Sequence, residues 1–65
     1  MKRATAQHAI DDAFADGLKH TFEILVAGLI GEKPSEAVEQ FRNGIAIHDE
    51  AYAQASRVIE QIFPD

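Results

Sequence analysis

The chain of 65 residues contains no cysteine. It can therefore form neither a disulfide nor a thiolate zinc site, which are two common supports of a small fold. A lone chain of this length buries only about 60% of the surface that its unfolded form exposes, so folding on its own would be marginal. Association with further copies is the simplest remaining way to enlarge the core. We therefore expect one domain, residues 1–65, that assembles as a homo-oligomer.

Basic residues are also scarce. Six lysines and arginines stand against eleven aspartates and glutamates, which gives a net charge of -5, and the cations form no cluster. Because contacts to phosphate supply most of the affinity for nucleic acids, we expect no nucleic-acid partner, and an RNA-binding bundle is a disfavoured alternative. The same charge balance argues against binding to an anionic membrane surface. It is compatible with a basic protein partner.

Long apolar runs and secretion signals are missing too. The most apolar run, residues 24–30, is much shorter than the roughly 20 residues that a membrane-spanning helix needs. The N-terminal segment carries Lys2 and Arg3 with no apolar stretch after them, unlike a signal peptide. We therefore expect a cytoplasmic protein with no membrane partner.

Patterns of catalytic residues are absent as well. Ser35 and Ser56 have no histidine and carboxylate at a recognisable spacing, and the chain has no glycine-rich phosphate loop. We therefore expect no enzymatic activity and no cofactor.

The second half of the sequence does contain a regular hydrophobic seam. Steps of three and four residues alternate without a break, as in the a and d positions of a heptad repeat. The seam consists of Val38, Phe41, Ile45, His48, Tyr52, Ala55, Ile59 and Ile62. It predicts a helix over about residues 34–62, with Pro64 marking the stop.

An earlier helix is predicted over about residues 5–30. Thr5 is the expected N-cap, and Asp11 and Asp12 are expected early in the helix, near the positive end of its dipole. Its core candidates are Phe14, Leu18, Phe22 and Leu25. The second half of this helix is apolar on most sides, so more than one neighbour must cover it.

Small residues accompany both helices. The row beside the seam is Ala37, Gly44, Ala51 and Val58, and the earlier helix contains Gly17 and Gly28. We interpret the glycines and alanines as sites of close helix approach, the alternative for Gly17 and Gly28 being tolerated defects. The resulting apolar face is wide enough for two partners. Ile47 lies off the seam, so it is either a rim residue or part of a partner surface.

A short turn between the helices indicates an all-α antiparallel helical hairpin. Gly31 is suited to the left-handed conformation that follows many helices, and Pro34 is suited to the first turn of the next one. Helices of similar length joined in this way lie antiparallel. One hairpin cannot cover its own wide apolar face, so we expect it to dimerise into a four-helix bundle.

His48 lies at the centre of the seam, close to where a dimer would have its two-fold axis. Two His48 rings meeting there would make a pH-sensitive or metal-bridged interface. The favoured interpretation is a structural, neutral histidine that fixes the register of the helices, as a lone polar residue in a seam often does.

Two further polar groups have weak functional signals. His20 and Glu23 share a face of the earlier helix and, with His48, are the ligand candidates for an alternative ferritin-like, metal-binding bundle. Their order is the reverse of the usual Glu-x-x-His motif, so we expect no metal site. Asp11, Asp12 and Asp16 form an acidic edge, interpreted as a solvated face rather than a docking site for a basic partner.

These features together predict a small, non-enzymatic, homodimeric helical interaction module. Its role would be that of a regulatory or adaptor protein that occludes or bridges another protein. The metal-binding bundle is the alternative from a different functional class.

Overall fold

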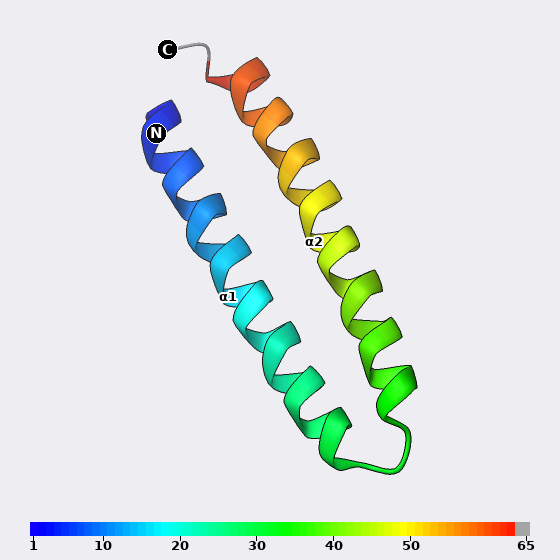
Figure 1. Cartoon of the computed structure of the whole chain (residues 1–65). Coiled ribbons are helices and arrows are strands. Elements are labelled where there is room, and N and C mark those ends of the chain that lie inside the picture. The colour runs from blue at the N-terminus through cyan, green and yellow to red at the C-terminus, as the bar shows by residue number, and fades with distance from the viewer. Residues whose placement is uncertain (64–65) are drawn as a thin grey trace.

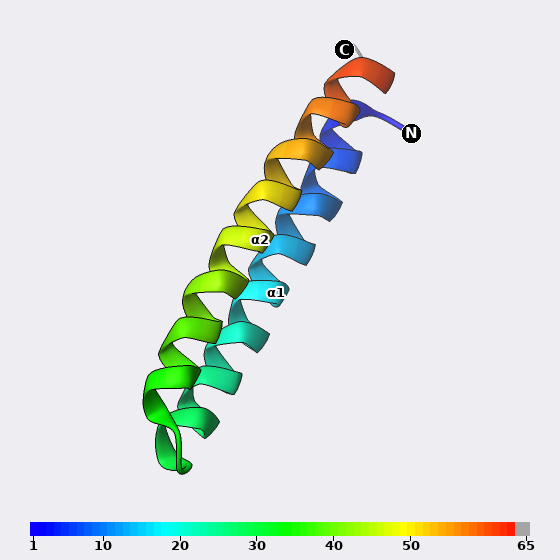
Figure 2. The same cartoon turned by 90° about the vertical axis from the view of Figure 1, so that its right-hand side faces the viewer.

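A computed structural model describes residues 1–63 as two long helices, α1 (Arg3–Ile30) and α2 (Pro34–Ile62), joined by residues 31–33 (Figure 1). The helices run antiparallel along their whole length, and the start of α1 and the end of α2 lie at the same tip (Figures 1 and 2). The predicted all-helical hairpin is therefore confirmed. Pro64, the expected stop of α2, lies outside the described residues.

The turn differs in detail from the expected left-handed one. Gly31 has φ -79° and ψ -167°, and none of residues 1–63 has a positive φ. The end of α1 is instead satisfied by a tighter bond, in which the Gly31 N–H donates to the Gly28 carbonyl over 3.2 Å. Pro34 begins α2 as expected, because its missing N–H costs nothing in the first turn.

The start of α1 also differs from the prediction. The helix begins at Arg3, Lys2 is its extended N-cap without a side-chain hydrogen bond, and Thr5 lies inside the first turn. Arg3 reaches across the hairpin to Glu60 on α2 (Nη2–Oε1 3.3 Å), a contact that supports the additional residues. The helix dipole acts mainly within the first turn. Since α1 begins at Arg3, Asp11 and Asp12 lie beyond that turn and outside its main effect.

Glycines allow α1 and α2 to approach closely near the turn. A Cβ built on Gly44 of α2 would lie 3.0 Å from the Cγ2 of Thr21 on α1. A Cβ built on Gly28 of α1 would overlap the Cβ of Ala37 on α2. Larger side chains at these positions would hold the helix axes further apart.

The line of contact with α1 drifts across the seam of α2. Near the turn, Ala37 is buried beside the seam while Val38 is 41% exposed. Near the chain ends, Ile59 is buried while Ile62 is 62% exposed. A heptad seam repeats every 3.5 residues whereas a straight α-helix repeats every 3.6, so the seam rotates by about 20° per heptad. The hairpin therefore covers only part of the seam.

The hairpin is a single layer of two helices. Its Cα extents are 49 × 15 × 8 Å, and its radius of gyration is 15.0 Å, compared with about 11 Å for a compact chain of this length. Among the described residues, only Ala6, Ala37 and Ile59 are buried, and no large side chain is completely inaccessible. Two alanines and one isoleucine form a very small core.

Candidate functional site

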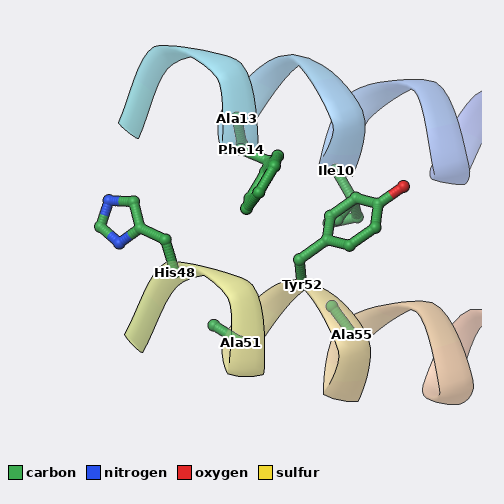
Figure 3. A pocket seen from close by; sticks show the side chains of 7 residues that line it. All are labelled: Ile10, Ala13, Phe14, His48, Ala51, Tyr52 and Ala55. Carbon is green, nitrogen blue, oxygen red and sulfur yellow. The ribbon is translucent and has the colours of Figure 1, made fainter. Parts of the chain in front are cut away.

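An apolar groove lies between the two helices, in the half of the hairpin nearer the chain ends (Figure 3). Its volume is about 270 Å³. On each helix the lining residues recur at steps of three or four positions, so they come from one side of that helix. The groove is lined by Ile10, Ala13, Phe14, His48, Ala51, Tyr52 and Ala55. His48 is the only one of these residues whose side chain can carry a positive charge.

Two aromatic rings form one wall of the groove. Phe14 of α1 and Tyr52 of α2 pack with their ring centroids 4.7 Å apart and their planes tilted by 41°. Such tilted pairs combine buried apolar area with favourable ring electrostatics. Ala13 and Ala51, which also line the groove, are small and exposed, so the groove stays open to solvent.

His48 lies at the edge of this groove, half-buried against α1. A Cβ built on Gly17 would lie 2.5 Å from its Nε2, so the absence of a side chain at Gly17 leaves the space for the imidazole. The structure therefore pairs two residues that the sequence singled out separately.

A second feature, the polar cluster, consists of Gln7, Asp11, Tyr52 and Ser56. The Tyr52 hydroxyl donates to Asp11 Oδ1 over 2.6 Å. The Gln7 amide Nε2 lies 3.0 Å from the same carboxylate oxygen, 3.2 Å from the Tyr52 hydroxyl and 3.2 Å from Ser56 Oγ. These bonds join α1 to α2.

The polar cluster shifts two pKa values in opposite directions. The hydrogen bond from Tyr52 holds the pKa of Asp11 below its ordinary value, and the Gln7 amide adds to this effect. The same bond to Asp11 raises the pKa of Tyr52, with desolvation as the second cause. Both shifts favour the ionised carboxylate and the neutral phenol, which are the forms that make the bond.

The predicted seam and core residues are divided between the hairpin contact and the surface. Half-buried positions are Phe14, Leu18, Leu25, Phe41, Ile45, His48, Tyr52 and Ala55. Ile59 is buried, while Phe22, Val38 and Ile62 are exposed. Of the small residues, Gly17, Gly28, Ala37 and Gly44 lie between the helices, whereas Ala51 faces the groove. Two helices alone thus leave part of the predicted apolar face uncovered.

The candidate metal ligands are not gathered in one place. His20 and Glu23 are exposed on α1, and His48 is half-buried between the helices. From Met1 to Phe63, no three His, Asp or Glu side chains come close enough together to hold a metal ion. Over the same residues, neither helix has the length and apolarity required to cross a membrane.

Sequence reasoning did not find the polar cluster. It assigned Asp11 to a solvated acidic edge and Tyr52 to the seam, and it gave Gln7 and Ser56 no paired role. The only signal was their spacing: Gln7 and Asp11 are one turn apart on α1, as Tyr52 and Ser56 are on α2. Their pairing also requires the alignment of the two helices, which the sequence pattern alone does not supply.

Comparison with known proteins gives no further information about the site. The sequence matches no protein-family model, and neither curated proteins nor solved structures give a significant match.

Proposed function

We propose that this protein is a non-enzymatic, homodimeric helical module that regulates or bridges another protein. The observation that carries the proposal is the small core of the single hairpin, in which only Ala6, Ala37 and Ile59 are buried among the described residues. Stable domains normally bury their apolar faces between at least two layers of secondary structure. A second hairpin would supply the missing layer in a four-helix bundle.

The exposed apolar side chains support the same proposal. Within the described part of the chain, ten large hydrophobic residues are exposed: Met1, Phe22, Ile24, Val26, Leu29, Ile30, Val38, Ile47, Val58 and Ile62. They lie on several sides of the hairpin, so one dimer contact cannot cover them all. The apolar surface left over after dimerisation is the part that we assign to a partner protein.

The assembly is tested by size-exclusion chromatography with light scattering, alongside circular dichroism. We expect a particle of twice the chain mass of 7.2 kDa at micromolar concentration. A particle of the single-chain mass that keeps its full helical signal would contradict the proposal, because the hairpin would then be stable without a second layer.

The partner is tested through Phe22, which is 56% exposed on α1. Immobilised wild-type protein should retain a specific protein from an extract of the native host. The Phe22→Asp variant should lose that protein while remaining dimeric. Retention of the same protein by the wild type and by Phe22→Asp would show that the surface around Phe22 is not the binding site.

A further inference from the structure

The face that contains the apolar groove is open on the single hairpin. Resting on the proposed homodimer, we propose that a second copy of the chain covers this face, with its Ile47 side chain seated in the groove against Ala51. The two-fold axis would cross α2 between Ile47 and Ala51, so each copy would both donate an isoleucine and accept one. The two α2 helices would then run antiparallel to each other.

The exposed area matches what a dimer of this size requires. The hairpin exposes 4985 Å². A compact protein of 7.2 kDa exposes about 4100 Å². The excess of roughly 900 Å² is close to the approximately 800 Å² per partner of a standard protein interface. One additional hairpin on one face is therefore sufficient to bring the exposed area of each chain to that of a compact protein.

Charge favours a copy of the same chain on the groove side of α2. The row that includes Ala51 continues through Ala37, Gly44 and Val58, and its neighbouring row is Gln40, Ile47, Gln54 and Gln61. None of these residues is charged. The charged residue nearest to these two rows at the proposed axis is Glu50, which is exposed one turn from Ile47. The chain carries a net charge of -5, and a two-fold contact brings like groups together near its axis, so the two uncharged rows, with Glu50 at their rim, are the part of α2 that best permits self-association.

The opposite face is less suitable for a second copy. It contains the polar cluster, because Asp11 and Ala13 are two residues apart on α1 and therefore point to different sides of the helix. The Asp11 carboxylate is ionised and hydrogen-bonded there. Covering this carboxylate with another copy would remove it from water, and each copy would bring a second carboxylate of the same sign.

Ile47 is the residue suited to the groove. It is 66% exposed, although its neighbours one turn away, Gly44 and Ala51, are small. Ile47 and Ala51 are four residues apart and so lie on the same side of α2. An isoleucine beside a small residue in one copy complements the same pair in the other when the helices cross antiparallel, as a knob fits a hole. Position 47 also lies near the middle of α2, where a two-fold axis lets both helices overlap fully.

The test compares two matched aspartate variants by light scattering over a dilution series. Ile47→Asp places a carboxylate in the groove contact, and we expect the dimer dissociation constant to rise at least about a hundredfold. Phe22→Asp places the same group on the other side of α1, since position 22 lies about two and a half turns beyond Ala13. We expect this variant to dimerise like the wild type.

The reverse result, in which Ile47→Asp stays dimeric and Phe22→Asp becomes monomeric, would overturn the assigned face while leaving the homodimer intact. A monomeric wild type would instead overturn the proposed function, and the groove would then be open to a different protein.

Cross-linking keeps the test decisive if Ile47→Asp fails to fold. The chain has no cysteine, so introduced cysteines are the only thiols. A mixture of the Ile47→Cys and Ala51→Cys variants should form a disulfide-linked heterodimer under mild oxidation, identified by mass spectrometry. The Phe22→Cys variant mixed with Ala51→Cys should not. Absence of the 47–51 link from a protein shown to be dimeric would overturn the proposal.

Discussion

Tyr52 contributes to the hairpin through two parts of its side chain. Its ring packs on Phe14 at the wall of the groove, and its hydroxyl donates to Asp11 in the polar cluster. A shift of α2 along α1 by one turn would separate both pairs at once. Tyr52 therefore ties the apolar and polar contacts of the interface to one alignment of the helices.

Acid should weaken the hairpin through Asp11. Because its folded pKa lies below the ordinary value of 3.8, the bond with Tyr52 contributes fully above that value and is lost as pH falls through the folded pKa. We expect Asp11→Asn to lower the melting temperature at neutral pH and to reduce its fall between about pH 6 and pH 2, measured by circular dichroism.

Asp12→Asn is the matched control for this prediction, since Asp12 is the exposed neighbour of Asp11. It should leave the acid profile close to that of the wild type. Equal profiles for the two variants would mean that the bond between Asp11 and Tyr52 contributes nothing to stability.

At alkaline pH the dependence of stability on pH has the opposite sign. The raised pKa of Tyr52 means that its contribution is complete below 10.0 and is lost as pH rises through the higher folded value.

At the scale of the helices, α1 and α2 lie close together near the turn, where Gly28 faces Ala37. Neither residue has a flexible side chain that could move aside. A methyl group added at Gly28 must therefore displace one helix backbone relative to the other.

Gly28→Ala should accordingly destabilise the protein. The displacement is an overpacking cost of about 1–3 kcal/mol. Alanine's better helix propensity returns roughly 1 kcal/mol. We expect a net loss of about 1 kcal/mol in the free energy of unfolding, measured by urea titration.

Gly31→Ala serves as the control for Gly28→Ala. Gly31 has a negative φ, and its added Cβ would meet only ordinary contacts, the nearest being the Gly28 carbonyl oxygen at 3.4 Å. It should change stability little. An increase in stability for Gly28→Ala would show that the helices can separate there without loss.

The sequence was sufficient to predict the two helices and the turn. Pro34 and the three-four spacing from Val38 to Ile62 are local signals, and they located the ends of α2. Gly31 marked the turn, although not its conformation. Thr5 was the wrong N-cap because Arg3, paired with Glu60 across the hairpin, belongs to the helix.

The groove and the polar cluster could not be predicted in the same way. Both depend on which residues of α1 lie opposite which residues of α2, and a seam with regular spacing is compatible with several alignments. The bond between Asp11 and Tyr52 joins residues 41 positions apart. The exposure of Val38 and Ile62 depends on how far a straight helix rotates away from its own heptad seam.

At the scale of the whole molecule, a single layer with an 8 Å Cα extent in its thinnest direction has little interior. Among residues 1–63, burial of the exposed large hydrophobic side chains is what could stabilise it further. Under the proposed assembly, folding and association are coupled, and stability belongs to the dimer rather than to the chain.

The melting temperature should therefore rise with protein concentration. A hundredfold increase in concentration should raise it by at least about 5 °C, because mass action favours the associated state. Differential scanning calorimetry over that range measures the effect. A melting temperature independent of concentration, in a protein shown to be monomeric, would contradict coupled folding and association.

The ion pair between Arg3 and Glu60 holds the start of α1 and the end of α2 together at one tip, and residues 31–33 form the other. A protein fused to the start of α1 or to the end of α2 is thus separated from the turn by most of the 49 Å length. In the antiparallel dimer proposed above, the tips formed by the start of α1 and the end of α2 in the two copies would lie at opposite ends of a rod. The assembly would then act as a rigid spacer that holds two attached proteins apart and facing away from each other.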